Sequence, residues 1–420
     1  MLGLNDVVPR AAWRYRSLPL LGSHVEDFVT WMSARGYRET TLYGMLIMLP
    51  RIDRWLREHG VEQLAAIDPA ILSQCWKAFV GRQGQPSAVV RALHEFLAAH
   101  GSVQPERPKS ITPSEQLAAE YGRHLETARG LCRDTIDNHA RTILRFLKHV
   151  GYDGDPPRLK TVTASDIEAF IRDRAPHLRR TSLQVMIGEL RCFLRFVGAW
   201  FDAPAGLETH IDTPRVYTQE QLPRALPWET VQALLESIDR STPRDTRDHA
   251  MLFLTATYGL RVGEVVALTL DDINWRHGRL KIVQEKTRSQ LVLPLTDQAG
   301  SVILDYLRKA RPLGVDSRRL FISNRAPIKP LARSAVTAAF ERHAKRSGLK
   351  IPFAGAHCLR HSYAVHLLRK GVSLKLIGDL LGHRSAGSTC VYLRLATEDL
   401  RQVPLPVPKK PIASNREVQP

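Results

Sequence analysis

Apolar residues recur at helical spacing through most of the chain, which predicts a largely helical protein. One clear apolar stripe consists of Ile136, Ala140, Ile143, Leu144 and Leu147. Arg141, Arg145 and Lys148 fall on another face of the same predicted helix. A row of cations on a helix is ordinarily a solvated surface.

The spacing of apolar residues changes from that of helices to that of strands in one region of the chain. Arg279–Gln284 and Gln290–Leu295 predict two strands of a hairpin, joined by E-K-T-R-S. A helix that starts near Pro227 and a long apolar helix through M-L-F-L-T-A-T-Y-G-L precede these strands, and helices return from Ala332 to about Leu400. The expected fold class is mainly α, with an α+β segment that holds a small antiparallel sheet.

The first two helical segments resemble each other. Arg35-Gly36 and Thr41 recur as Arg129-Gly130 and Thr135 at an offset of 94. Arg54-Trp55-Leu56 and Gly60 recur as Arg145-Phe146-Leu147 and Gly151 at an offset of 91. The pattern predicts two copies of one unit that differ by three residues in a connecting helix, although chance could produce matches of this number.

Proline-rich and polar stretches divide the chain. Linkers are expected at Gln104–Pro113 and at Ala203–Pro227. The predicted parts are an extra N-terminal helical domain (1–105), a second helical domain (113–203), an α+β domain (224–403) and a proline-rich mobile tail (404–420).

Charge restricts the class of partner. Among 420 residues, 60 Lys and Arg exceed 42 Asp and Glu, for a formal net charge of +18. This excess favours a polyanion such as nucleic acid, although an arginine-rich proteome would give the same balance. No stretch is apolar enough to span a membrane, the N-terminus lacks a signal-peptide pattern, and five cysteines form no C-x-x-C pair. A cytoplasmic protein with reduced thiols is therefore expected.

The C-terminal half carries residues that suit phosphodiester cleavage. The candidates are Arg261, Lys286, His357, Arg360, His383 and Tyr392. Cleavage by direct attack places negative charge on the phosphate oxygens, and arginine can grip two of these oxygens at once. Glu264, one turn after Arg261, is placed to hold its guanidinium, although taken alone this is more often an ordinary helix ion pair.

The two histidines depend on their context. His-x-x-Arg occurs four times in the chain, so the spacing by itself is weak evidence. Only His357/Arg360 leads into L-R-H-S-Y-A and then into L-L-G-H, where Gly382 is placed to end a helix just before His383. A lone histidine there would ordinarily be a surface residue, and Tyr392 nine residues later favours a role in a site.

Tyr392 is the candidate nucleophile. A phenol with a pKa of about 10 needs a proton acceptor and neighbouring positive charge. His357 is a candidate acceptor, and Lys286 in the predicted hairpin turn is the candidate general acid for the leaving 5′-oxygen. Arg288 is near enough to Lys286 to assist it. In a chain with such residues, the row Arg141, Arg145 and Lys148 is about equally explained as a DNA-phosphate contact or as a solvated face.

The sequence contains no recognisable motif for metal binding or for ATP binding. H-C-L-R-H lacks the glutamate of a zinc-protease helix, no acidic triad stands out, and no phosphate-binding G-x-x-x-x-G-K-[ST] loop occurs. No cofactor is expected.

From about Pro227 to Arg401 the sequence resembles the tyrosine recombinases of the phage-integrase family. Four stretches carry the resemblance in the family's order: T-A-T-Y-G-L-R-V-G-E-V-V-A-L, K-I-V-Q-E-K-T-R-S-Q-L-V-L-P-L, H-C-L-R-H-S-Y-A-V-H-L-L and L-G-H-R-S-A-G-S-T-C-V-Y. Residues from Ser114 to about Phe201 resemble the family's helical, SAM-like core-binding domain.

The resemblance implies function. The six candidates would occupy the family's catalytic positions, with Tyr392 forming a 3′-phosphotyrosyl bond without metal or ATP, and four protomers would assemble on two duplex DNA sites. L-R-L-A-T-E-D-L-R would be a helix that packs into a neighbour. Gly387 and Cys390 depart from the family pattern and predict a looser segment before Tyr392.

The role implied is integration, excision or transposition of a mobile element, alone or with related recombinases. The extra N-terminal unit would lengthen the DNA footprint or contact protein. Three alternatives stay open at this point: a relative that binds DNA without cutting it, a type IB topoisomerase, and a metal-dependent nuclease or transposase.

Overall fold

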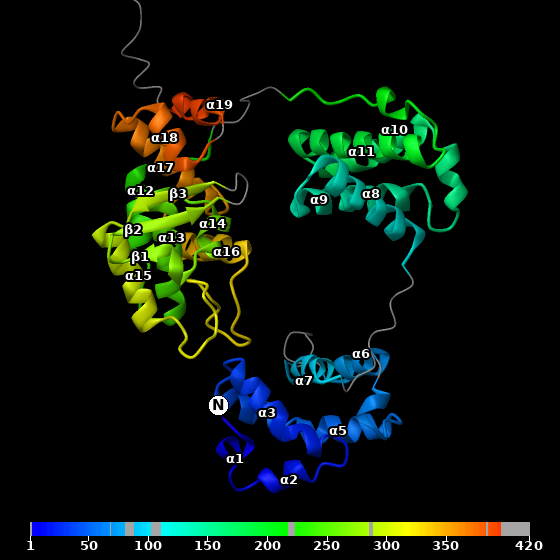
Figure 1. Ribbon diagram of the computed structural model, residues 1–420, viewed down its shortest axis with the longest axis vertical. Coiled ribbons are helices and arrows are strands. Elements are labelled where there is room, and N and C mark those ends of the chain that lie inside the picture. The colour runs from blue at the N-terminus through cyan, green and yellow to red at the C-terminus, as the bar shows by residue number, and fades with distance from the viewer. Residues whose placement is uncertain are drawn as a thin grey trace, which may run out of the picture. The chain divides into compact units, whose positions relative to one another are not determined.

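The computed structural model (Figure 1) describes residues 2–67, 69–79, 88–101, 111–216, 223–284, 289–383 and 385–395. The chain divides into two compact units, Met1–Gln104 with Gln221–Pro420, and Pro105–Glu220. The predicted mobile tail, 404–420, lies outside the described residues, and the boundaries of the four predicted parts stay predictions.

Short helices build the N-terminal part around a core of its own. They are α1 (Leu4–Val7), α2 (Ala12–Arg16), η1 (Gly22–His24), α3 (Val25–Ala34), α4 (Glu39–Leu46), α5 (Leu49–Glu58), η2 (Leu64–Ala66), α6 (Pro69–Ala78) and α7 (Ala88–Ala99). Phe28, Ile52 and Phe96 are among its fully buried side chains. Pro50 separates α4 from α5, since proline lacks the amide proton and clashes with the carbonyl four residues back, at Leu46, where α4 ends.

Residues 111–216 form a second helical body. Its elements are α8 (Pro113–Arg129), α9 (Arg133–His149), η4 (Pro156–Thr161), α10 (Ala164–Arg174), η5 (Ala175–His177), α11 (Arg180–Trp200) and η6 (Leu207–His210). Thr112 and Glu115 form a reciprocal capping box at the start of α8, and Gly130 ends that helix with φ 60°. The predicted stripe on α9 faces the core, with Ile143 and Leu147 fully buried.

The third part combines helices with a sheet. Its first elements are α12 (Trp228–Glu236), α13 (Pro243–Tyr258), α14 (Val262–Ala267), η7 (Leu270–Asp272), β1 (Ile273–Asn274), β2 (Arg279–Val283), β3 (Gln290–Pro294) and α15 (Asp297–Lys309). Buried Leu280 on β2 stands opposite Ile273 on β1 and Leu293 on β3 in an antiparallel ladder against the core. The predicted hairpin is confirmed, each strand ending one residue earlier than expected. β1 was missed because two residues are too short to show alternation.

The chain ends in a run of helices, as predicted. They are α16 (Arg333–Arg346), α17 (His357–Arg369), α18 (Leu374–Leu381), α19 (Ala386–Cys390) and η8 (Val391–Leu395). Tyr392 belongs to a small apolar cluster with Ala364 and Val365 of α17 and Ile377 and Leu381 of α18. The five cysteines are all free thiols, as expected from their number and spacing.

Candidate active site

Arg261 lies at the start of α14, just after the tight turn that ends α13. Gly259 closes α13 in the left-handed conformation (φ 62°), and Arg261 is the residue before the first turn of α14. Its Nη1 donates to Glu264 Oε1 at 2.7 Å, and its backbone amide donates to Oε2 at 2.8 Å. Glu264 is only 4% exposed, so its buried carboxylate holds the Arg261 guanidinium in one orientation.

Arg360 joins the ends of two helices. On α17 its side chain is buried, and its Nη1 and Nη2 donate to the carbonyls of Gly259 and Leu381, each at 2.6 Å. Arg261 Nη2 lies 3.5 Å from the carbonyl of Gly382, the left-handed residue that ends α18. Helix C-termini carry unsatisfied carbonyls and partial negative charge, so the C-terminal ends of α13 and α18 together bind the guanidinium groups of Arg261 and Arg360.

Three histidines and Tyr392 lie next to this arginine pair. His361 Nδ1 is 3.0 Å from the Tyr392 hydroxyl, and the ring of His357 is centred 4.5 Å from that of His361. The rings of His383 and Tyr392 are nearly parallel, with centroids 6.3 Å apart, and His383 Nδ1 is 2.8 Å from the Thr389 hydroxyl. Tyr392 itself is 2% exposed.

Burial and the arginines set the protonation of these groups. Burial, followed by the charges of His357 and Arg360, lowers the pKa of His361 to about 4. Burial, with Arg360 and Arg261, also lowers the pKa of His383 to about 4. Burial raises the pKa of Tyr392, against the opposing pull of both arginines. Both imidazoles are therefore neutral and the phenol is protonated near neutral pH.

Arg360 remains charged in this setting. Burial and the neighbouring charge of Arg261 lower its pKa to about 10, which is still well above neutral pH. Two of its five N–H groups are used by the carbonyls, which leaves donors for a further anionic group.

Residues at the ends of β2 and β3 also lie beside Gly382 and His383. Lys286 and Arg288 lie outside the described residues, but the two ends of their turn are defined by a 2.9 Å bond from the Gln284 amide to the Ser289 carbonyl. The Gln284 side chain packs against Gly382 so closely that a Cβ there would lie 1.7 Å from Gln284 Nε2. A cavity of about 450 Å³ is lined by Gln284, Ser289, Gln290, Leu291, Asp379, Gly382 and His383. Gln284 and Ser289, the described residues on either side of 285–288, thus line the same cavity as His383.

The structure places Arg261, Glu264, Arg360, His383 and Tyr392 close together, with His357 beside a further histidine, His361. The catalytic roles of the predicted residues stay predictions. His361 was not predicted as a site residue, because H-C-L-R-H was interpreted only as a possible zinc motif and lacks the glutamate of that motif. Its spacing of four from His357, which places both on one side of a helix, was the available signal.

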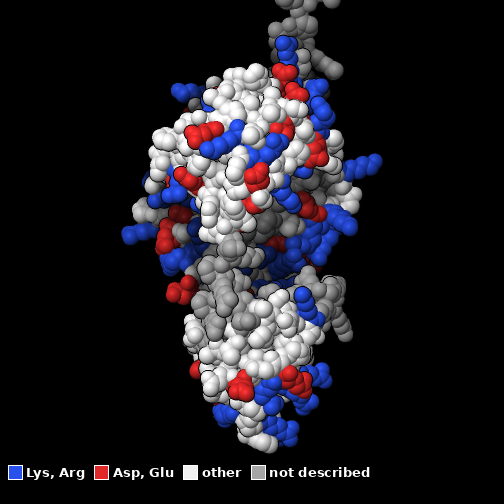
Figure 2. Space-filling model, turned by 90° about the vertical axis from the view of Figure 1, so that its right-hand side faces the viewer, with Lys and Arg blue, Asp and Glu red and all other residues white. Residues whose placement is uncertain are grey.

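The candidate DNA contacts on α9 are all solvent-exposed. Arg141, Arg145 and Lys148 form the predicted row along one face, and Arg141 also donates to the Asp137 carbonyl and the Asn138 side chain of its own helix. On the face of the molecule drawn in Figure 2, Lys and Arg side chains are spread widely among scattered Asp and Glu.

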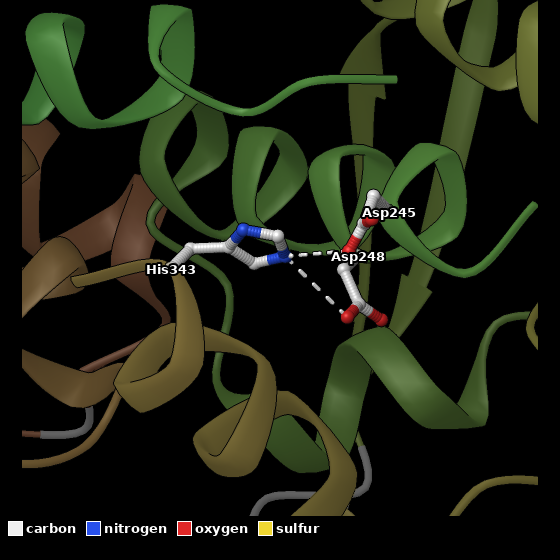
Figure 3. A group of neighbouring side chains, drawn as sticks. All are labelled: Asp245, Asp248 and His343. Carbon is white, nitrogen blue, oxygen red and sulfur yellow. Dashed lines mark ion pairs between the residues drawn. The ribbon is translucent and has the colours of Figure 1, made fainter. Parts of the chain in front are cut away.

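A separate cluster of Asp245, Asp248 and His343 has the spacing of metal ligands (Figure 3). Asp248 already pairs with Arg247 and Arg342, while Asp245 accepts from Arg346 and Thr242. His343 Nε2 lies 3.5 Å from a carboxylate oxygen of each aspartate. Every carboxylate oxygen in the cluster therefore faces a donor within the chain, and the group is a buried ion-pair network that ties α13 to α16.

Comparison with known proteins defines the class. Residues 118–199 match the phage integrase N-terminal SAM-like domain, and residues 224–399 match the phage integrase family. A Sinorhizobium fredii protein named as an integrase/recombinase (y4rA) is 33% identical over 92% of this chain and 94% of its own length. Tyrosine recombinase XerD of Corynebacterium glutamicum is 28% identical over 68% of this chain and 96% of its own.

Solved structures share the fold. The XerH site-specific recombinase, bound to a palindromic difH substrate, is similar with a TM-score of 0.55 and 19% identity, over 84% of this chain and 93% of that one. A lambda integrase dimer bound to a COC′ core site is similar with a TM-score of 0.52 and 22% identity, over 66% and 94%.

The family match and the sequence relatives define a class of enzymes that cleave and rejoin DNA. This chain belongs to the phage integrase family of tyrosine recombinases. The family, the mainly helical fold class and the enzyme class expected from the sequence are thereby confirmed. Among the described residues, no helix is both long and apolar enough to cross a membrane.

Proposed function

We propose that this recombinase cuts one strand of duplex DNA with the hydroxyl of Tyr392, forming a 3′-phosphotyrosyl bond, and rejoins that end to a different strand. The observation that carries the proposal is the placement of the Tyr392 hydroxyl at 3.0 Å from His361, beside the buried Arg360 and the fixed Arg261. A phenol, a proton acceptor and two preorganised cations are the parts that direct attack on phosphorus requires.

The step balances without metal or nucleotide. The Tyr392 oxygen bonds to phosphorus while the bond from phosphorus to the 5′-oxygen breaks. Arg261 and Arg360 hold the non-bridging oxygens with the N–H groups that the helix carbonyls leave available, and His383 donates to the same phosphate. Lys286 protonates the departing 5′-oxygen, and the reverse sequence with a 5′-hydroxyl of the partner strand restores a continuous backbone.

The phenolic proton passes to an imidazole. His361 is at hydrogen-bonding distance, and the ring of His357 lies against that of His361, so both histidines can take part. Burial, followed by the charges of His357 and Arg360, lowers the pKa of His361 to about 4. A phosphate bound by Arg360 would offset the charge of that arginine and would make the imidazole a better base.

The biological role is integration, excision or transposition of a mobile element, on duplex DNA and in an oligomer. Support comes from the name of the relative y4rA and from the lambda integrase structures, which are named as a dimer on a core site and a tetramer on a Holliday junction. Contacts from Arg141, Arg145, Lys148 and Arg288 to phosphates, and a cytoplasmic location, belong to the same proposal.

The test uses a nicked suicide duplex that carries the DNA flanking this gene's element, in EDTA and without ATP. Wild type is expected to give a protease-sensitive protein–DNA adduct, and Tyr392→Phe to bind without forming one. Tyr363→Phe, which alters a half-buried tyrosine of α17, is the matched control and keeps the adduct. An adduct from Tyr392→Phe overturns the proposal, and relaxation of plasmids that lack the flanking DNA would favour a topoisomerase.

A further inference from the structure

The N-terminal part repeats the order of elements found in residues 111–216. A helix ended by a left-handed glycine, a second helix ended by another, a 3₁₀ turn and two further helices follow one another in both. The first set is α3, Gly36, α4 with α5, Gly60, η2, α6 and α7; the second is α8, Gly130, α9, Gly151, η4, α10 and α11, with the short η5 between the last two helices. The SAM-like family match covers only the second set.

Buried positions match at constant offsets. Leu64, Ile67, Leu72 and Cys75 correspond to Leu159, Val162, Ile167 and Phe170 at an offset of 95, and all eight are buried. Val90, Leu93, Phe96 and Leu97 correspond to Ile187, Leu190, Phe193 and Leu194 at an offset of 97, and again all eight are buried. Within each segment four buried positions keep one register, and the two registers differ by only two residues, which supports a common origin of the two bodies.

The same aromatic pair links the first helix to the last in each body. Phe28 and Phe96 have ring centroids 5.4 Å apart in an edge-to-face arrangement with an interplanar angle of 69°. Their counterparts Tyr121 and Phe193 are also 5.4 Å apart, at 75°. The geometry of the core is therefore repeated as well as its composition.

The turn after the second helix is also shared. The amide of Gly60 donates to the Arg57 carbonyl at 3.0 Å, and that of Gly151 to the Lys148 carbonyl at 3.2 Å. Pro50 accounts for the main difference, because it divides the first copy into α4 and α5 at the point where the offset changes from 94 to 91.

The repeat places a basic row on α5. Arg54 and Arg57 correspond to Arg145 and Lys148 of α9, and all four are exposed. Arg51 adds a third exposed arginine one turn earlier, while the buried Ile52 and Leu56 face the core. Asp53 is fully buried, accepts from the amides of Leu20 and Leu21, and pairs with Arg57, so it offsets the charge of Arg57 but not that of Arg51 or Arg54.

We infer that the N-terminal part is a second copy of the SAM-like unit and that the arginines of α5 bind the phosphate backbone of duplex DNA. The inference rests on the proposed DNA substrate and adds a second contact to it. Three exposed guanidiniums at successive turns match the repeated negative charge of a DNA backbone, and two of them, Arg54 and Arg57, have basic counterparts at the equivalent positions of α9.

The test measures the salt dependence of binding by the full chain to a random-sequence duplex several helical turns long. Arg51→Gln with Arg54→Gln removes two charges and leaves Arg57 to pair with Asp53. The plot of log affinity against log salt concentration is expected to become shallower by about 1.8, from two lost phosphate contacts. Arg10→Gln with Arg14→Gln alters two exposed arginines that precede the repeat, removes the same charge, and is expected to keep the wild-type slope.

Outcomes separate this inference from the proposed reaction. Thermal melting first shows that the α5 variant is folded. An unchanged salt slope, or an equal decrease in both double variants, overturns the inference, as does a changed oligomeric state with an unchanged slope. Adduct formation on the suicide duplex is read in parallel: if wild type forms the adduct while the slope is unchanged, the proposed function stands and only the second DNA contact is rejected.

Discussion

His361 Nδ1 lies 3.0 Å from the hydroxyl of Tyr392, four residues along α17 from the histidine of the His-x-x-Arg motif. The contact holds the phenol of a buried tyrosine in one orientation. It also gives the phenol a neutral imidazole partner, because burial and nearby cations lower the pKa of His361 to about 4.

His361→Ala should therefore slow cleavage by about 10²-fold or more, with DNA affinity unchanged. His361→Asn keeps a polar group near the position of Nδ1 but accepts a proton poorly. If His361 only positions the phenol, the His361→Asn variant should recover most of the wild-type rate. If His361 is the base, the His361→Asn variant should recover little of that rate, and the acid limb of its pH–rate profile should be lost. Single-turnover adduct formation across pH measures both. A wild-type rate for His361→Ala would contradict either role.

Arg360→Lys should lose cleavage and stability together. Lysine keeps the charge, but its ammonium cannot reproduce the fork that reaches the carbonyls of Gly259 and Leu381. One buried carbonyl is then left unpaired, which costs about 1–3 kcal/mol of unfolding free energy. Chemical denaturation measures this loss, and the adduct assay measures the loss of rate. Arg369→Ala, at the exposed end of the same helix, is the control and should change stability by less than about 0.5 kcal/mol.

Gly382→Ala should disturb the hairpin as well as the backbone. Gly382 has φ +64°, and an added Cβ would collide with the Gln284 side chain. Gly278, with φ +57° and open space around its Cα, carries the same backbone strain without the collision. Gly278→Ala should cost about 1 kcal/mol and Gly382→Ala clearly more, with reduced cleavage in the second variant only. Equal losses of stability and rate would show that the contact between Gln284 and Gly382 does not position the hairpin.

Acid should destabilise the protein before its carboxylates titrate. Burial, followed by Arg240, lowers the pKa of His249 from 6.5 to about 4, and His361 and His383 are lowered to a similar value. Between pH 6.5 and about pH 4 the histidines bind protons in the unfolded chain but not in the folded one. Their contribution to the free energy of unfolding is therefore fully present above about pH 6.5 and is lost as the pH falls toward 4.

Thermal melting of wild type and His249→Gln at pH 7 and pH 5 tests this. The variant should lose less stability than wild type on acidification, by on the order of 1 kcal/mol, because one of the histidines with a lowered pKa is gone. The same loss in both proteins would mean that His249 is not a source of the acid sensitivity.

The sequence by itself determined the local and the chemical parts of this protein. Helical spacing on α9, the glycine that ends α18 and the alternation of β2 and β3 are properties of a few neighbouring residues, so they could be predicted from the residues concerned. The order of Arg261, His357, Arg360, His383 and Tyr392 indicated the family, because this combination suits one kind of chemistry.

Only the tertiary structure decided how these groups meet. Arg360 finds its acceptors at Gly259 and Leu381, about 100 and 20 residues away along the chain, and such contacts depend on how three helices pack. His361 meets Tyr392 for the same reason, since a hydrogen bond across 31 residues leaves no local signal. The lowered pKa of His383 likewise arises from burial and from Arg360 and Arg261, which come close to it only in the folded chain.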